Sequence, residues 1–389
     1  MRSAMAISLP ESFSQIPRHA ILYQTPSPIH PLPTLSISTP KTSPRISLFA
    51  KRDDHSSPLA CAGNKYRKLE YIVPDILSNN PIHHAHENNP NPSPPLAGPA
   101  TTLVTEGAIQ SNHTVQVAAL ARKLGLRAVV LLHRGTGGGL RAAADKEAYL
   151  RSGNVQINHL LGADVRVCES GDALARDATP LLEELMADGE RPYWIPGGAS
   201  LHPLGGLGYA RAAFEIALQE QEIELSGSGR FDYVFVACGS GSTVGGLVAG
   251  FHLLEKMGGG SRRVIGVLNS PTMPRKYHEE RVLAFARKAG RMIGVAEGDI
   301  GMDEVRLDDR FVGSGYGILD ADAKEALESM ARTEGMILDP VYTAKVARGM
   351  MHWAKEREVV NMEQPSDEVN VLFIHTGGQT ALGAYADIK

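Results

Sequence analysis

Residues 101–133, TTLVTEGAIQSNHTVQVAALARKLGLRAVVLLH, hold two apolar runs with a polar turn and a helical pattern between them. The runs Thr101–Thr105 and Ala128–Leu132 are continuous rather than alternating, which is typical of parallel strands covered on both faces. From Val117 to Leu124 the apolar residues recur on one helical face, and Gly125 stands where a helix commonly ends. This stretch therefore predicts a strand–helix–strand unit of a parallel sheet.

Similar apolar runs recur along the chain, with helical patterns between them. They are Ala163–Cys168, Tyr233–Cys238, Val264–Leu268 and Val369–His375. Strands that alternate with helices favour an α/β fold whose mainly parallel sheets are covered by helices. A chain of 389 residues is also long enough for two domains of ordinary size.

The composition excludes several classes of partner. With 39 basic and 43 acidic residues the net charge is −4, and no basic stripe appears, so we expect no nucleic-acid partner. No apolar run approaches the roughly 18–20 residues of a membrane span. The three cysteines are an odd number and widely spaced, which favours a reducing compartment over a disulfide framework or a zinc site. The first residues lack a signal-peptide core, so we expect a cytoplasmic protein and leave an organellar address open.

Two stretches have the composition of loops. Residues 79–100 carry six prolines and five asparagines, and we expect a solvated insertion there. Their His-His-Ala-His run, residues 83–86, is also compatible with metal binding, but no cysteine or carboxylate constellation accompanies it. We therefore expect no metal site. Residues 32–45 form the second stretch of this kind.

A first chemical motif is GNKYRKL, residues 63–69. It places Lys65 at the start of an amphipathic segment, where the positive end of a helix depresses the pKa of an ammonium group. A nucleophilic lysine needs such a depression. The alternative is a solvated cluster of basic residues on a helix face.

A second motif, GAIQSNH, directly follows the strand predicted at residues 101–105. Ser111 and Asn112 therefore lie at the carboxyl end of a parallel strand, where α/β proteins commonly bind ligands. They are expected either to touch a bound ring or carboxylate, or simply to cap the helix that follows.

A third motif, GSGSTVGG, occupies residues 239–246 between a strand and a helix. Its small residues let backbone N–H groups approach an anion at a helix N-terminus, as in a phosphate cradle. The lysine of a nucleotide P-loop is absent, and the dinucleotide pattern fits poorly, so a small phosphorylated cofactor is favoured. A tight-packing turn is the alternative.

Two further motifs, DPVYTAK at residues 339–345 and HTGG at residues 375–378, add Tyr342 and Thr376 as loop residues. Pyridoxal phosphate (PLP) needs a lysine, a partner for its phenolic oxygen, an anion site and a group facing its ring nitrogen. The combined motifs match these four needs and predict PLP as the cofactor.

Six motifs in order, GNKYRKLEY, GAIQSNH, IPGGAS…GGLGY, GSGST, DPVYTAK and HTGG, resemble the family of 1-aminocyclopropane-1-carboxylate (ACC) deaminase and D-cysteine desulfhydrase. The resemblance runs from about Ile16 to Tyr385. It implies a fold-type II PLP enzyme, similar to the tryptophan synthase β subunit, in which a small domain is inserted into a larger cofactor domain. Here the small domain is expected at residues 65–204 and the large one at residues 1–64 and 205–389. The resemblance also implies a homodimer.

The resemblance assigns roles to residues of the cofactor site. Lys65 is expected to link to the cofactor and to act as the base at the substrate α-carbon. Asn112 is expected to contact the phenolic oxygen, and Thr343 and Thr376 to lie near the ring nitrogen. The phosphate is expected to contact Lys68, Ser240, Gly241, Ser242 and Thr243.

On the substrate side, the resemblance implies that Ser111 contacts the substrate carboxylate or a proton in transit. Asn112 and His113 are expected beside the substrate, although His113 is given no catalytic role. Tyr316 and Tyr342 match the two tyrosines that line the substrate side in the family, where their phenols orient the substrate or relay protons.

The residues at the ring nitrogen predict which member of the family the chain resembles most. The deaminases have D-P-V-Y-E and H-L-G-G, whereas this chain has Thr343 and Thr376 at those places, as the desulfhydrases do. A neutral hydroxyl stabilises a pyridinium less than a carboxylate does, so the cofactor is a weaker electron sink. We therefore predict an α,β-eliminating lyase that converts D-cysteine to pyruvate, ammonia and sulfide.

Three alternatives stay open from the sequence. One is an ACC deaminase that forms 2-oxobutyrate and ammonia. Another is a related lyase or β-replacement enzyme that acts on a different β-substituted amino acid. The third is a PLP-fold protein that binds a ligand without catalysis, against which the presence of Lys65, Ser111 and Asn112 argues.

Overall fold

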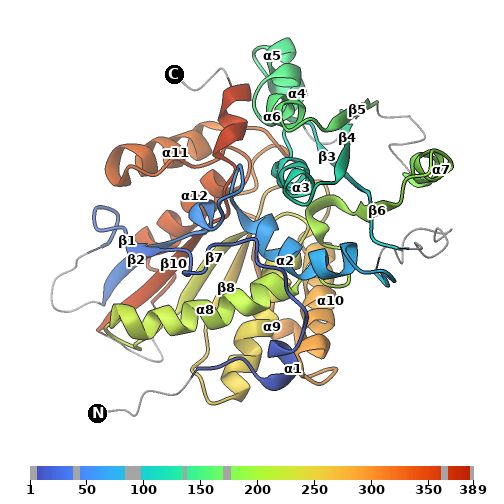
Figure 1. The fold of residues 1–389 in the computed structure, drawn as a ribbon. Helices are drawn as coiled ribbons and strands as arrows, with labels where there is room; N and C mark the ends of the chain where they lie inside the picture. Colours follow the sequence, from blue (N-terminus) through green and yellow to red (C-terminus); the bar gives the residue numbers. More distant parts are fainter. Residues whose placement is uncertain are drawn as a thin grey trace.

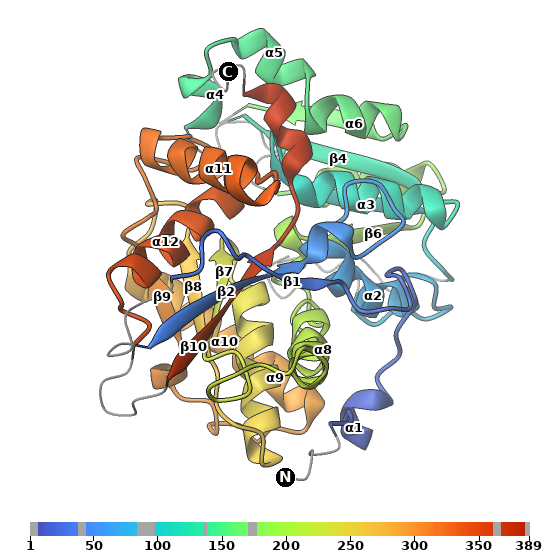
Figure 2. The same cartoon turned by 90° about the vertical axis from the view of Figure 1, so that its left-hand side faces the viewer.

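The computed structural model describes residues 7–37, 44–83, 98–134, 138–169, 177–360 and 367–385. These residues form two sheets, with helices on both faces of each (Figures 1 and 2). The predicted α/β fold with mainly parallel sheets is confirmed.

The larger sheet has six strands in the order β1-β2-β10-β7-β8-β9, of which only β1 is antiparallel to its neighbour. Its strands are β1 (Ile29–Pro31), β2 (Arg45–Arg52), β7 (Tyr233–Cys238), β8 (Arg263–Leu268), β9 (Arg306–Asp308) and β10 (Glu368–His375). The strands predicted at residues 233–238, 264–268 and 369–375 are confirmed. Strand β2 was not predicted, because Ser47 interrupts its apolar residues and Lys51 follows them; the buried charge of Lys51 is neutralised by Glu215 inside the protein.

Helices cover both faces of the larger sheet (Figure 2). On one face lie α8 (Leu207–Ile223), α9 (Ser242–Lys256) and α10 (Arg275–Ile293), and on the other lie α11 (Ala321–Glu334) and α12 (Thr343–Lys355). Helix α9 lies so close to α8 that a Cβ at Gly246 would be 2.3 Å from the carbonyl oxygen of Gly206. The second half of GSGSTVGG is thus needed for helix packing, whereas its first half forms the turn before α9.

The smaller sheet has four parallel strands in the order β5-β4-β3-β6. Its strands are β3 (Thr102–Ala108), β4 (Arg127–His133), β5 (Asp164–Cys168) and β6 (Pro192–Ile195). Helix α3 (Asn112–Lys123) packs on β3 and β4, and α7 (Thr179–Ala187) buries three leucines against their other face. The strands predicted near residues 101–105, 128–132 and 163–168 and the helix after Ser111 are confirmed. The four-residue strand β6 was too short to predict.

The remaining helices join the two sheets or lie at their edges. They are α1 (Glu11–Ser14), α2 (Asn64–Ile76), α4 (Gly139–Ala142), α5 (Lys146–Arg151) and α6 (Asn154–Leu160). Helix α2 packs against both α8 and α3, so it bridges the two sheets. Residues 84–97, most of the expected insertion, and nearly all of the histidine run lie outside the described residues.

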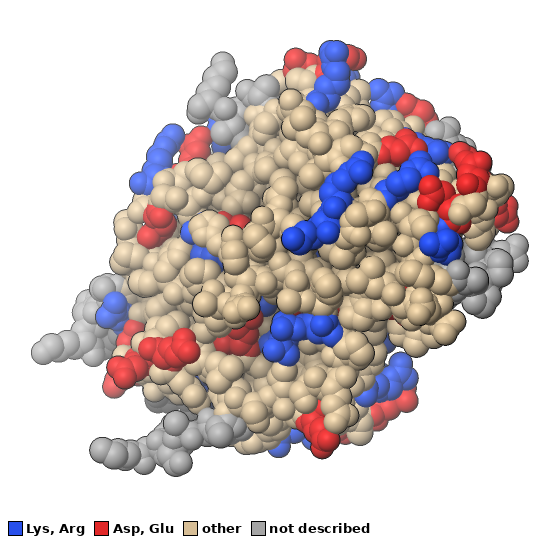
Figure 3. All heavy atoms as spheres, in the orientation of Figure 1, with Lys and Arg blue, Asp and Glu red and all other residues tan. Residues whose placement is uncertain are grey.

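The charged side chains in Figure 3 are scattered over the face it shows, with acidic and basic groups close together. Among the described residues of this face, no continuous basic surface forms. No helix in the described part of the chain is long and apolar enough to cross a bilayer. Within the same residues, no group of three or more histidine, cysteine, aspartate and glutamate side chains is arranged to hold a metal ion.

Candidate active site

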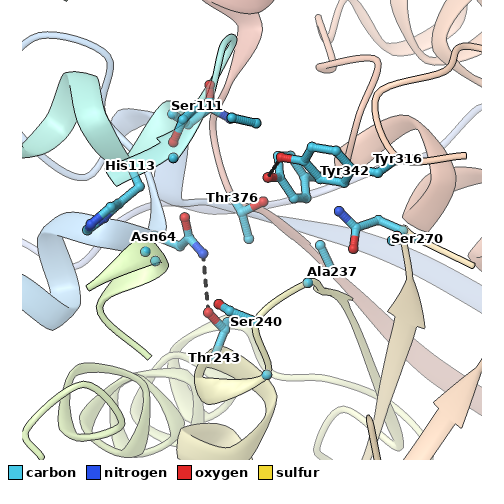
Figure 4. A pocket seen from close by; sticks show the side chains of 18 of the residues that line it. Asn64, Ser111, His113, Ala237, Ser240, Thr243, Ser270, Tyr316, Tyr342 and Thr376 are labelled. Atoms are coloured by element: carbon cyan, nitrogen blue, oxygen red, sulfur yellow. Dashed lines mark hydrogen bonds between the residues drawn. The ribbon is translucent and has the colours of Figure 1, made fainter. Parts of the chain in front are cut away.

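A cavity of about 360 Å³ lies where the carboxyl ends of β7, β8 and β10 face the carboxyl end of β3 (Figure 4). Parallel α/β sheets commonly bind their ligands at such an edge. The cavity brings together ten of the predicted site residues: Lys65, Ser111, Asn112, His113, Ser240, Gly241, Thr243, Tyr316, Tyr342 and Thr376. Residues from distant parts of the chain therefore converge as expected.

Lys65 is the second residue of α2 and faces the cavity. Its ammonium group donates to Oδ1 of Asn64 at 2.9 Å, and the amide of Asn64 donates to Oγ1 of Thr243 at 3.2 Å (Figure 4). Burial lowers the pKa of Lys65 to about 8, although the charge of Asp339 opposes this shift. Lys65 is therefore more readily deprotonated than an ordinary lysine, as a nucleophile requires.

The residues of the GAIQSNH motif surround the start of α3. Ser111 caps this helix by accepting from the backbone N–H of Thr114, and it also lines the cavity, so both functions considered for it are compatible. The Oδ1 atom of Asn112 accepts from Asn154 at 2.7 Å, which fixes its amide plane. His113 is buried against Thr105, and burial together with the charges of Lys65 and Lys68 holds its pKa well below the ordinary value. His113 is thus a neutral side chain.

The loop between β7 and α9 has the features of an anion site. Gly241 has a φ of 100° and lets the chain turn directly into α9, whose first turn no side chain caps. Lys68 is fully buried behind this loop, and its ammonium group donates to Oγ of Ser242 at 2.9 Å and to the carbonyl of Gly198 at 3.0 Å. Lys68 and Ser242 do not line the cavity themselves. Free backbone N–H groups with a lysine behind them suit a phosphate.

Tyr316 and Tyr342 meet through their hydroxyl groups at the other wall of the cavity, with their rings 5.9 Å apart (Figure 4). Burial raises the pKa of both phenols, so both are protonated at neutral pH. Lys345, also fully buried, donates to the carbonyls of Asn269, Val312 and Gly315. It thereby fixes the loop that carries Tyr316.

The two threonines expected at the ring nitrogen are placed differently. Thr376 lines the cavity at the end of β10. Thr343 does not line it, contrary to expectation, because its hydroxyl donates to Oδ1 of Asp339 at 2.7 Å and accepts from the backbone N–H of the same residue. The Asp339 carboxylate also accepts from three backbone N–H groups at the start of α12. Thr343 therefore belongs to a helix cap, and only Thr376 faces the site.

Several polar residues of the cavity were not predicted from the sequence. They are Asn64, Glu106, Asn269, Ser270, Thr272, Tyr277, His278 and Arg281. Asn269 follows β8, so the strand-end argument used for Ser111 would have found it. Its side-chain Nδ2 is buried without a hydrogen-bond partner among the described residues, which leaves a donor available to a ligand. His278 and Arg281 lie on α10, where no local pattern distinguishes them from the other polar residues.

These donors fit a small phosphorylated aldehyde. The cavity offers a lysine of lowered pKa, an anion cradle and an unpartnered amide, and glycine is required at Gly198, where a Cβ would lie 2.7 Å from Oγ of Ser240. The family model described as pyridoxal-phosphate dependent enzyme matches residues 21–377. The chain belongs to this family. Its cofactor is pyridoxal phosphate, and its fold is the fold type II expected from the sequence.

Comparison with relatives and solved structures shows which members of the family this PLP enzyme resembles. A relative from Burkholderia multivorans described as 1-aminocyclopropane-1-carboxylate deaminase is 36% identical over 97% of this chain and 98% of its own length. One of the same description from Ralstonia nicotianae is 37% identical over 95% and 96%. The crystal structure of an ACC deaminase homologue superposes with a TM-score of 0.74 at 29% identity, covering 97% of this chain and 96% of its own. An O-ureido-L-serine synthase, at 12% identity and a TM-score of 0.55, shares the fold.

The lowered pKa of Lys65 predicts how the cofactor-free PLP enzyme captures its cofactor. Only the neutral amine attacks an aldehyde, and with a pKa of about 8 the neutral fraction rises with pH up to that value. We expect the capture rate to fall about tenfold for each pH unit below about 8 and to level off above it. Stopped-flow absorbance at a series of pH values measures this rate. A rate that keeps rising to pH 10 would show an ordinary lysine pKa.

Proposed function

We propose that this PLP-dependent enzyme is an α,β-eliminating lyase that acts on D-cysteine. The observation that carries the proposal is the neutral hydroxyl of Thr376 at the end of β10. Of the described residues that line the cavity, Glu106 is the only carboxylate, and it lies on β3, in the other sheet. No carboxylate of the cavity lining is therefore available beside the ring nitrogen.

In this proposal each residue of the site has a separate chemical role. The bound cofactor supplies an electron-withdrawing ring that stabilises negative charge at the substrate α-carbon. Lys65, as the neutral amine, removes the α-proton, and Asn112 orients the ring through its phenolic oxygen. Ser111 binds the substrate carboxylate. The paired phenols of Tyr316 and Tyr342 donate a proton toward the leaving group.

The phosphate anchors the cofactor in this proposal. The backbone of residues 240–243 and the side chains of Ser240 and Thr243 would hold it, and Lys68 lies behind Ser242. Burial and the charge of Lys65 hold the pKa of Lys68 well below its ordinary value, and a bound dianion restores the charged form.

The hydroxyl of Thr376 favours elimination over cyclopropane opening. A hydroxyl stabilises a protonated ring nitrogen less than a carboxylate does, so the ring withdraws electrons less strongly. Cyclopropane opening needs strong delocalisation of the carbanion. β-Elimination needs less, because departure of the thiolate removes the negative charge as it forms.

The second candidate is ACC deamination, which two observations favour. The relatives at 36–37% identity are described as ACC deaminases. In addition, the charge of Asp339 opposes the lowering of the pKa of Lys65, so this carboxylate acts electrostatically on the cavity although Thr343 does not line it. A nearby negative charge would favour a protonated ring nitrogen and so strengthen the ring as an electron sink.

Product analysis distinguishes the two candidates. The purified holoenzyme is offered D-cysteine, L-cysteine and ACC separately, and pyruvate, sulfide and 2-oxobutyrate are measured. We expect pyruvate and sulfide from D-cysteine alone. 2-Oxobutyrate from ACC, with D-cysteine inert, would overturn the proposal and assign the second candidate.

We also propose a domain division, an assembly and a compartment. Residues 65–204 form the small domain, in line with the origin of all four strands of the smaller sheet within this range. Residues 1–64 and 205–389 form the cofactor domain. The enzyme is a cytoplasmic homodimer, for which light scattering of the purified protein is the direct measurement.

A further inference from the structure

Arg281, in the second turn of α10, is a cation without an anionic partner at the wall of the cavity. It lines the cavity and is half-buried, and its guanidinium carbon lies 5.5 Å from the centre of the Phe285 ring. No carboxylate in the described part of the chain lies within ion-pair distance of it. Other cations of the same helix do have such partners: Arg275 pairs with Glu279 and Arg291 with Glu297.

The packing of α10 places Arg281 beside the anion loop. A Cβ at Gly241 would lie 3.3 Å from both the Phe285 ring and Cγ2 of Val282, so these side chains rest directly on the turn before α9. Arg281 precedes Val282 in the helix and stacks on Phe285. Its guanidinium is therefore held next to the loop by the same ring that covers Gly241.

A second polar group on the same wall also lacks a partner. His278 lies one helical turn before Arg281 and lines the cavity. It is only 8% exposed, and its Nε2 has no hydrogen-bond partner among the described residues. Burial, together with the charge of Arg281, lowers the pKa of His278, so the ring is neutral and one nitrogen is free to bond a ligand.

We propose that Arg281, supported by His278, binds the phosphate group of the cofactor from the side opposite Lys68. The loop and the N-terminus of α9 hold the phosphate through backbone N–H groups, Lys68 lies behind them, and the guanidinium closes the cavity side. An arginine fork matches two phosphate oxygens at once and carries its charge at every physiological pH. Lys68, whose pKa burial and the charge of Lys65 hold well below its ordinary value, regains its charge only once the dianion is bound.

Cofactor affinity tests the proposal without relying on turnover. The full-length protein is stripped of cofactor and titrated with PLP, and separately with pyridoxal, which has no phosphate. Loss of a charge-assisted hydrogen bond lowers the binding affinity roughly 10- to 100-fold. We expect Arg281→Met to weaken PLP binding by this factor and to leave pyridoxal binding unchanged. We expect inorganic phosphate to compete with PLP for the wild-type protein and to compete more weakly in the variant.

Three further variants make the result interpretable. Lys276→Met removes an exposed positive charge from the same helix and should bind PLP as the wild type does. Arg281→Lys keeps the charge and should recover part of the lost affinity. Arg281→Gln, which keeps a polar side chain, is a second neutral variant and serves as the test variant if Arg281→Met does not fold.

Three outcomes would overturn the proposal. In the first, Arg281→Met binds PLP as tightly as the wild type. In the second, PLP and pyridoxal lose affinity equally, which would indicate a packing role. In the third, PLP affinity is unchanged but the KM for an amino-acid substrate rises, which would assign the guanidinium to a substrate anion. Because the readout is cofactor binding, the result is independent of whether D-cysteine or ACC is the substrate.

Discussion

Replacing Lys65 with alanine is expected to abolish turnover and to remove the yellow absorption of the lysine-linked cofactor. Lys65 is the lysine that faces the cavity, and its pKa of about 8 makes it available as a neutral amine. The variant loses both the covalent attachment and the base at the α-carbon, so we expect a loss of at least about 10³-fold in kcat/KM. Visible spectra and a product assay on the same sample measure the two effects.

The control for this prediction is Lys123→Ala, at the exposed end of α3. It removes a lysine of the same chain at a distance from the cavity, and it should keep both the absorption and the activity. A Lys65→Ala protein that still shows the absorption band of a lysine-linked cofactor would contradict the assignment. Lys68, also buried beside the loop, would then be the next residue to test.

The parts of the site that could be predicted are those that follow the carboxyl ends of strands. Ser111, Asn112 and Ser240 lie two to four residues after a strand, so the topology of a parallel sheet alone brings them together. Lys65 was predicted from its place at a helix start. The structure adds that removal from water lowers its pKa, which a sequence pattern cannot show because burial depends on distant residues.

The parts that could not be predicted depend on contacts between distant residues or on side-chain orientation. Thr343 was expected in the site because the resemblance matches it to the glutamate of D-P-V-Y-E, but its hydroxyl turns back to Asp339, four residues earlier. Arg281 lies on a helix that carries many other polar residues, and only the packing of α10 on Gly241 places it at the cavity. Strand β2 was not predicted because a lysine is not expected inside a covered strand. Lys51 can be buried there because Glu215 of α8, which is distant in sequence, neutralises its charge.

Contacts between residues that are distant in sequence also stabilise α2, the helix that carries Lys65. Arg67, two residues further along α2, is fully buried and donates to both carboxylate oxygens of Asp53, at 2.9 and 2.7 Å. It also donates to Glu215 of α8 at 2.9 Å. Lys51 of β2 completes the cluster by pairing with Glu215, so two cations balance two carboxylates inside the protein.

Arg67→Met is expected to be among the most destabilising single substitutions in the described part of the chain. It leaves Asp53 with no cationic partner and Glu215 with only Lys51. Removing one member of a buried ion cluster costs about 3–5 kcal/mol of unfolding free energy, because the remaining charge stays buried without compensation. Urea unfolding followed by circular dichroism measures the loss. As a matched control, Arg166→Met breaks surface pairs with Asp164 and Glu184 and should cost about 0–1 kcal/mol.

The pH dependence separates lost charge pairing from lost packing. Burial opposes ionisation of Glu215, but the charges of Arg67 and Lys51 overcome this and hold its pKa below the ordinary value. A lowered carboxylate pKa stabilises the fold above the ordinary pKa of about 4.3, and this contribution is lost as the pH falls below it. In Arg67→Met the Glu215 carboxylate protonates more easily, so the stability gap to the wild type should narrow below about pH 4.3. A gap that stays constant with pH would mean that Arg67 stabilises α2 through packing alone.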